Sequence, residues 1–89
     1  MSSRQLTVEN RLGLHARASA QVVRCLGPFE ANLLFRFRGR EINPKSIMGL
    51  MLLAASRGSV IEVEAEGADA DAALEALTQL FAERFGEAE

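Results

Sequence analysis

Alternation of apolar and polar side chains in three short segments constrains the fold of this chain more than any other feature. The pattern occurs in residues 4–10 (RQLTVEN), in residues 32–38 (NLLFRFR) and in residues 60–66 (VIEVEAE). A period of two residues predicts β-strands with one buried face and one face in water. We therefore expect one sheet that packs all its helices on a single side.

Three further segments have the patterns of helices. Residues 16–26 place a polar stripe opposite an apolar one. A second, short helix is predicted to start after its N-cap, Ser46, and to end just before Gly58. A long final helix is predicted to be capped by Asp69, with an apolar stripe that ends near Phe85.

The resulting order of elements is β-α-β-β-α-β-α, because a turn at residues 39–40 returns the chain as a short hairpin strand. This order predicts an α+β fold, a two-layer open-faced β-sandwich. Its four-stranded antiparallel sheet would carry three helices on one face. The 89 residues are too few for a second core, so we expect a single domain over residues 1–89.

Composition excludes several classes of protein. One cysteine, Cys25, permits no internal disulfide, and together with one histidine it is too little for a structural metal site. No apolar run approaches the roughly 20 residues of a membrane span, and the N-terminus lacks the apolar core of a secretion signal. We expect a cytoplasmic protein without metal, cofactor or membrane insertion.

The charges are divided along the chain. Through Arg57 there are nine Lys and Arg against three Glu, a balance of +6, whereas from Gly58 onward one Arg stands against nine acidic residues, a balance of −8. An anionic ligand or an acidic partner would fit the basic part, which contains the only histidine, His15. The alternative is that solvated charged faces simply segregate.

His15 stands at the predicted start of the first helix. If the helix begins there, the backbone N–H groups of Ala16, Arg17 and Ala18 lack intrahelical partners, and such a terminus binds phosphate readily. Arg17 can add a forked, charge-assisted contact, and Gly13 gives the preceding loop conformational freedom. Neutral imidazole is a competent nucleophile near pH 7, so these parts suit a phosphohistidine site. Taken alone, however, such a histidine is usually a cap or a surface residue.

The wider sequence around His15 resembles the family of histidine-containing phosphocarrier proteins, HPr and its nitrogen-related relative. Residues 12–20 (LGLHARASA) resemble the active-site segment of that family, and residues 43–51 (NPKSIMGLM) resemble its second segment. Residues 62–77 (EVEAEGADADAALEAL) are similar to its last strand and helix. The resemblance thus covers nearly the whole chain.

This resemblance implies a phosphocarrier of the phosphoenolpyruvate-dependent phosphotransferase system. Nδ1 of His15 would accept phosphate from phospho-enzyme I and pass it to a downstream EIIA-type protein, with Arg17 contacting the phosphoryl group. Ser46 would be the target of a regulatory kinase, the HPr kinase/phosphorylase. The chain would be a carrier rather than an enzyme, and we expect a monomer.

The sequence departs from the family at one position of the active-site segment. Family members commonly read HARP where this chain reads HARA, so that Ala18 replaces a proline. Proline would pre-set the backbone of the first turn, whereas alanine supplies an N–H group and a high helix propensity. We expect a change in loop rigidity or phosphate lifetime, with a competent nucleophile.

The helix after Ser46 has two apolar stripes, which is one more than a surface helix needs for burial. The stripe expected in the core comprises Leu50, Leu53 and Ala54. The nearly opposite stripe, with Ile47 at its border, comprises Met48, Met51, Leu52 and Ala55. We expect this second stripe to be an exposed docking surface for enzyme I, with Arg24 as its charged rim. The alternative is a helix buried on both sides.

Other features of the sequence suggest three alternative functions. A Cys–His hydrolase is excluded, because His15 and Cys25 lie ten residues apart, about 15 Å along a helix axis. A nucleic-acid module would fit the basic segment FRFRGR, but alternation sends its phenylalanines and its first arginines to opposite faces, so we expect no nucleic-acid partner. A regulatory or scaffold relative of the nitrogen branch would bind partners without phosphotransfer. NRLGLHAR favours that branch and KSIMGLM favours the sugar branch.

Overall fold

Four strands and three α-helices lie along residues 2–89, the part of the chain that the computed structural model describes. Their order is β-α-β-β-α-β-α, as the sequence predicts, followed by one turn of 3-10 helix. The elements are β1 Ser2–Thr7, α1 Ala16–Leu26, β2 Asn32–Phe37, β3 Arg40–Ile42, α2 Ile47–Leu53, β4 Val60–Glu66, α3 Ala70–Ala82 and η1 Arg84–Gly86.

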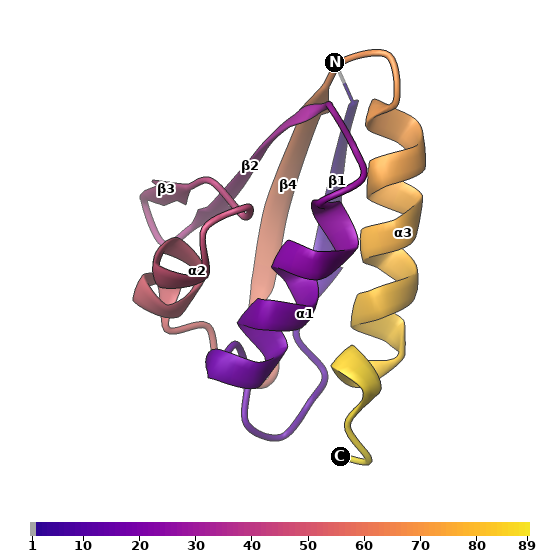
Figure 1. The fold of residues 1–89 in the computed structure, drawn as a ribbon. Coiled ribbons are helices and arrows are strands. Elements are labelled where there is room, and N and C mark those ends of the chain that lie inside the picture. The colour runs from indigo at the N-terminus through magenta and orange to yellow at the C-terminus, as the bar shows by residue number, and fades with distance from the viewer. Residues whose placement is uncertain (1) are drawn as a thin grey trace.

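The strands form one antiparallel sheet in the order β1-β4-β2-β3. The strand β4 is one of the two inner strands; it pairs with β1 on one side and with β2 on the other, so it connects the N-terminal strand to the β2–β3 hairpin. All three helices cover the same face of the sheet, with α1 between α2 and α3 (Figure 1). The predicted open-faced sandwich is confirmed.

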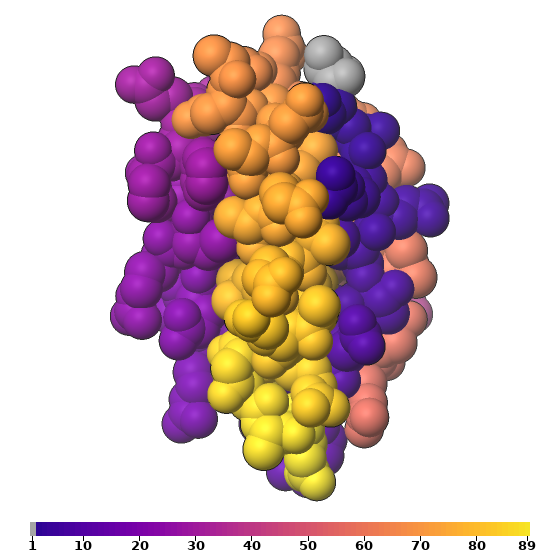
Figure 2. Space-filling view, turned by 90° about the vertical axis from the view of Figure 1, so that its right-hand side faces the viewer, coloured from indigo at the N-terminus to yellow at the C-terminus, as the bar shows by residue number. Residues whose placement is uncertain are grey.

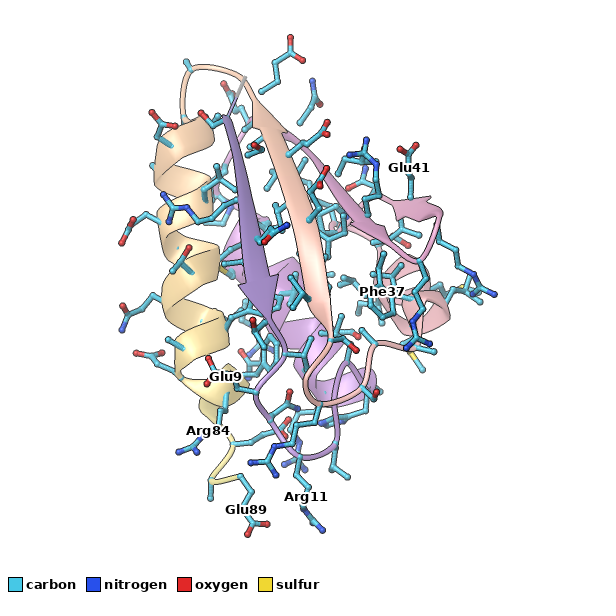
Figure 3. All side chains as sticks on the ribbon, turned by 180° about the vertical axis from the view of Figure 1, so that it is seen from behind. Glu9, Arg11, Phe37, Glu41, Arg84 and Glu89 are labelled. Atoms are coloured by element: carbon cyan, nitrogen blue, oxygen red, sulfur yellow. The ribbon has the colours of Figure 1, made fainter. Side chains whose placement is uncertain are left out.

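The alternation that predicted the strands matches their burial. In β4, Ile61, Val63 and Ala65 are buried beneath the helices, whereas Glu62 and Glu66 are exposed on the opposite face. That face carries many polar side chains and no covering helix (Figure 3). The first strand begins and ends earlier than predicted: it spans Ser2–Thr7, whereas the alternating segment spans residues 4–10. Val8, just after the strand, is buried, and its N–H donates to the Ser59 carbonyl.

The prediction for the end of α2 is wrong. The helix stops at Leu53, four residues before the expected end, because Ala54 adopts a left-handed conformation with φ of 52°. This turn reverses the two alanines that follow the helix: Ala54, expected in the core, is exposed, and Ala55, expected at the surface, is buried. The carbonyl of Ala55 accepts a 2.9 Å hydrogen bond from Leu14 N–H. The early end of α2 therefore anchors the loop that carries His15.

Asp69 precedes α3 as predicted but does not cap it through its side chain. Its carboxylate accepts hydrogen bonds from the backbone N–H groups of Glu30 and Ala31, at 2.9 and 2.8 Å. The bond from Glu30 contributes most to holding the pKa of this carboxyl below its ordinary value, against the opposing effect of burial. Asp69 thus ties the loop after α1 to the start of α3.

Candidate functional site

His15 is the N-cap of α1, as the sequence predicts, and its loop is held by backbone contacts. Gly13 has a φ of 70°, and a Cβ atom at this position would clash with the carbonyl oxygen of Ala55. Both observations require glycine here, since a side chain would meet a fixed backbone atom and a strained conformation. The position of His15 therefore depends on the close approach of Gly13 to the chain after α2.

The hydrogen bonds of the imidazole define its tautomer. Nδ1 accepts a hydrogen bond from the backbone N–H of Arg17, at 3.3 Å. Because a backbone N–H can only donate, Nδ1 carries a lone pair, and the proton of the neutral ring is on Nε2. Nε2 lies 2.7 Å from Oε2 of Glu87 and donates to it. The Arg17 amide, expected to lack a partner, is engaged by the ring itself.

Glu87 is a site residue that the sequence reasoning missed. Its Oε1 accepts a 3.0 Å hydrogen bond from Nδ2 of the fully buried Asn10, which also donates to the Gly13 carbonyl at 2.8 Å. Burial acts to raise the pKa of Glu87, but the hydrogen bonds from Asn10 and His15 and the charges of His15 and Arg17 outweigh it. The pKa of the carboxyl is therefore below its ordinary value, and Glu87 is an anion at neutral pH.

A left-handed turn at the end of α3 brings Glu87 to the histidine. Arg84, Phe85 and Gly86 have φ values of 55°, 57° and 81°, and the ring of Phe85 is buried edge-on against Phe81. The only advance signal for this contact was the surplus of acid after Gly58, opposite the basic part that holds His15.

The last residues are tied to the loop before His15. Arg11 N–H donates to the Glu89 carbonyl at 2.9 Å, and the two side chains form an exposed ion pair. Arg11, Arg84 and Glu89 lie at the same end of the molecule (Figure 3). The C-terminal segment follows α3 down one side of the molecule to this end (Figure 2).

An open depression of about 880 Å³ lies over this end of the molecule. His15, Ala16 and Arg17 line it on one side and residues 85–89 on the other. His15 is partly exposed, with 28% of its side chain accessible, and Arg17 is exposed, whereas Ala18 is fully buried. Ala16 and Arg17, two of the three residues whose backbone N–H groups are expected to bind phosphate, thus line the depression, whereas the side chain of the third, Ala18, packs in the core.

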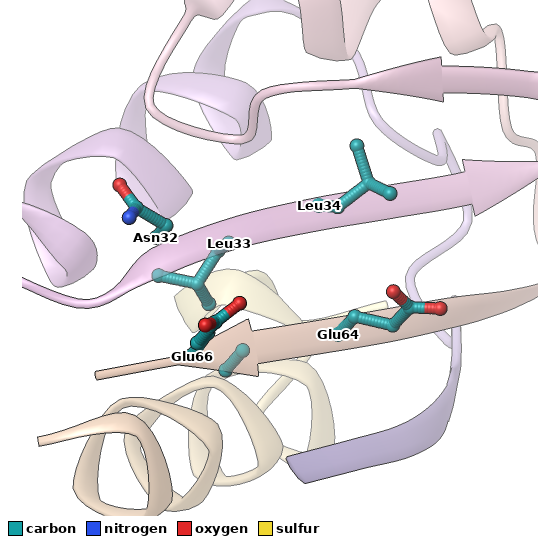
Figure 4. A pocket seen from close by; sticks show the side chains of 6 residues that line it. Asn32, Leu33, Leu34, Glu64 and Glu66 are labelled. Atoms are coloured by element: carbon teal, nitrogen blue, oxygen red, sulfur yellow. The ribbon is translucent and has the colours of Figure 1, made fainter. Parts of the chain in front are cut away.

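A smaller pocket of about 210 Å³ lies on the uncovered face of the sheet, between β2 and β4 (Figure 4). Two glutamates, Glu64 and Glu66, line it together with Asn32 and Leu34. Glu64 is hydrogen-bonded to Arg36, whose guanidinium also bonds Glu41 and Glu62. This pocket is therefore part of an ion-paired surface of the sheet. It shares no lining residue with the depression beside His15.

The second candidate segment forms the start of α2. Ser46 is its N-cap, as predicted, and its Oγ accepts a 3.1 Å hydrogen bond from Gly49 N–H. Beyond it, the second apolar stripe is exposed, apart from Ala55. Its exposed members, here called the docking face, are between 41% and 74% accessible and comprise Ile47, Met48, Met51 and Leu52. The sequence reasoning missed one exposed leucine, Leu12, in the loop before His15. Arg24 is exposed near the end of α1.

Other candidate chemistry is not assembled. Cys25 is half-buried against the core, and burial raises the pKa of its thiol. In residues 2–89, no three side chains of His, Cys, Asp or Glu come together as metal ligands would. No helix within the same range is long and apolar enough to cross a membrane.

Comparisons with known proteins place this arrangement in one class. Residues 2–83 match the family model described as PTS HPr component phosphorylation site. The chain is 52% identical over 87 residues to a phosphocarrier protein HPr of Xylella fastidiosa strain Temecula1, covering 98% of each chain. It is 46% identical over 89 residues to that of Cupriavidus necator, covering each chain completely.

Solved structures agree. The crystal structure of HPr-C-His from Thermoanaerobacter tengcongensis superposes with a TM-score of 0.95 at 36% identity, covering each chain completely. An HPr from Bacillus anthracis gives a TM-score of 0.83 at 40% identity, covering 88% of this chain and 93% of the other. The chain therefore belongs to the HPr family, the phosphocarrier proteins of the phosphotransferase system.

The contact at Gly13 can be tested against a matched glycine. We expect Gly13→Ala to destabilise the chain by roughly 3 kcal/mol, since it combines a positive φ with a steric clash. Gly39→Ala has a φ of 78° but nothing within 4 Å, so it should cost only about 1 kcal/mol. Urea unfolding of both variants measures the difference. Equal losses would show that the close approach to Ala55 contributes nothing.

Proposed function

We propose that the chain is a phosphoryl carrier that accepts phosphate on Nδ1 of His15 from phospho-enzyme I and passes it to an EIIA-type protein. Phosphoenolpyruvate is the ultimate donor. The observation that carries this proposal is that Nδ1 accepts a hydrogen bond and therefore holds a lone pair. The partly exposed His15 lies at the N-terminus of α1 and lines the open depression. In this role the chain is a carrier, and the partner proteins supply the catalysis.

The surroundings of His15 suit a group that must be held and then released. The positive end of the α1 dipole and the exposed Arg17 would stabilise a phosphoryl dianion. Both remain in contact with water, which screens them, so the phosphate is stabilised only moderately. The match of residues 2–83 to the HPr family model supports the same role. We also propose that residues 1–89 act as one monomeric domain.

The docking face gives enzyme I an apolar surface close to the site, with Arg24 as a charged rim toward an acidic partner. The acceptor would use the same surface after the donor leaves, and exposed methionines adapt to more than one partner. Ser46, at the start of α2, is the proposed regulatory phosphorylation site. A nucleic-acid role has less support, because Phe35 is fully buried and Arg36 is held by three glutamates.

Intact mass tests the acceptor. Incubation with phosphoenolpyruvate and enzyme I should add one phosphoryl group, which brief mild acid removes because the phosphate is bound to nitrogen. His15→Ala should take up none, and Arg17→Ala should accept roughly tenfold more slowly, through loss of a charge-assisted contact. Arg38→Ala, on the hairpin between β2 and β3, is the control and should behave as the wild type. An acid-stable adduct, or one that persists in His15→Ala, would contradict the proposal.

Charge on the docking face tests partner binding. Met48→Asp combined with Met51→Asp should weaken binding of enzyme I at least tenfold, since both side chains are exposed anchors. Titration calorimetry measures the affinity, and thermal unfolding should show a midpoint within a few degrees of the wild type. Val60→Asp adds charge to an exposed apolar position on the uncovered sheet face and should leave binding unchanged. A loss of affinity that only follows unfolding would show that the methionines are structural.

Modification of Ser46 tests regulation. Phosphorylated Ser46, and to a lesser degree Ser46→Asp, should slow phosphotransfer to His15 because negative charge is added beside Ile47 and Met48, against an acidic partner. Ser46→Ala removes the bond to Gly49 N–H, costs about 1 kcal/mol of stability and adds no charge, so its transfer rate should be normal. Initial rates with enzyme I decide the matter. Equal rates for phosphorylated and unmodified chains would refute the regulatory role.

A further inference from the structure

Glu87 contacts His15, yet the proposed carrier cycle gives this residue no role. Its side chain is only 13% exposed, although its neighbours in the chain, Gly86 and Ala88, are both exposed. Both carboxylate oxygens are used, Oε2 by Nε2 of His15 and Oε1 by the buried Asn10. A partly buried carboxylate held at both oxygens is a fixed charge, unlike an exposed surface glutamate.

We propose that Glu87 is a positioning residue for phosphotransfer, which keeps a proton on Nε2 of His15 in both the free and the phosphorylated forms. The inference rests on the proposed function, because it assigns a role within the same cycle. It draws on the 2.7 Å contact, the buried Asn10 that holds the carboxylate and the Arg17 amide that occupies Nδ1.

The proton balance of the cycle shows what the carboxylate does. Nδ1 attacks the phosphorus of the phosphorylated donor; a P–N bond forms as the bond from phosphorus to the donor atom breaks, and that atom keeps the electron pair. The His15 ring is then a cation whose proton remains on Nε2, opposite Glu87. When the phosphoryl group moves on, the P–N electron pair returns to Nδ1. No proton enters or leaves His15, so no general base is required.

The other charged groups around the ring leave this role to Glu87. Arg17 of α1 and Arg11 of the preceding loop line the same depression, and both are cations that cannot accept the Nε2 proton. The second carboxylate of the C-terminal segment, Glu89, forms an exposed ion pair with Arg11. Glu89 is therefore a matched control: it has the same charge and lies in the same segment, but another residue holds it.

The first experiment needs no partner protein. Since His15 is the only histidine, its Nε2 proton gives a single assignable signal in the NMR spectrum of the free chain. We expect this proton to be protected from exchange with water in the wild type and in Glu89→Ala. In Glu87→Ala its exchange should be about tenfold faster or more, as expected when a partly buried hydrogen-bond partner is removed. Equal protection in Glu87→Ala and the wild type would overturn the proposal.

The second experiment follows the phosphorylated ring. Glu87→Gln keeps an acceptor oxygen but removes the charge, so the fold should be preserved. Because the protonated phosphohistidine is the form that loses phosphate to water, the midpoint of the pH–hydrolysis profile should fall by about one pH unit, the effect of losing a close opposite charge. Glu89→Gln should keep the wild-type profile. A Glu87→Gln profile identical to that of the wild type would overturn the proposal.

Failure of this inference can be told apart from failure of the proposed function. Phosphoramidate, a small donor that phosphorylates imidazole without an enzyme, loads His15 for the hydrolysis measurement. If enzyme I and phosphoenolpyruvate fail to phosphorylate the wild type, the proposed function is wrong. The exchange and hydrolysis measurements would still decide whether Glu87 holds the Nε2 proton.

Discussion

One-sided burial of the sheet is the constraint on which the rest of the structure depends. Because the polar face of each strand stays in water, α1, α2 and α3 must share the other face (Figure 1). They pack side by side, and at one end the loop before α1 contacts both the chain after α2 and the chain after α3. Each of these three segments supplies part of the environment of His15. The site is thus a product of the layer arrangement as much as of any single motif.

The parts of the fold that depend on periodicity and capping could be predicted from the sequence. Alternation identified the strands, and the starts of α1 and α2 followed from His15 and Ser46 as N-caps. The end of α2 could not be predicted, because alanine at position 54 adopts a left-handed conformation that local sequence rules assign to glycine. Asp69 is the N-cap residue of α3 as expected, but its side chain does not cap the helix, because a distant loop takes the carboxylate.

The candidate site, like the fold, could be predicted only where it depends on local sequence. His15, Arg17 and Gly13 lie within one short segment, so their spacing and the helix start were enough to bring them together. Glu87 lies 72 residues further along the chain, and its approach depends on the left-handed Arg84 and Phe85. Residues such as Arg and Phe adopt that conformation at a cost that surrounding packing must offset, here through the buried Phe85 ring. The apolar stripe predicted the burial of Phe85, but the sequence pattern did not indicate the left-handed turn that brings Glu87 to His15.

The pairing of β1 with β4 has a consequence for how the molecule assembles. Ser2 lies opposite Ala65, so β4 cannot complete its ladder until the N-terminal strand has met a segment about 60 residues further along the chain. Contacts between such distant parts of a chain slow folding, because the loop must close before the contacts can stabilise it. No fragment shorter than most of the chain contains every contact around the histidine. The nucleophile's surroundings should therefore form in the same cooperative step as the sheet, with no locally folded precursor.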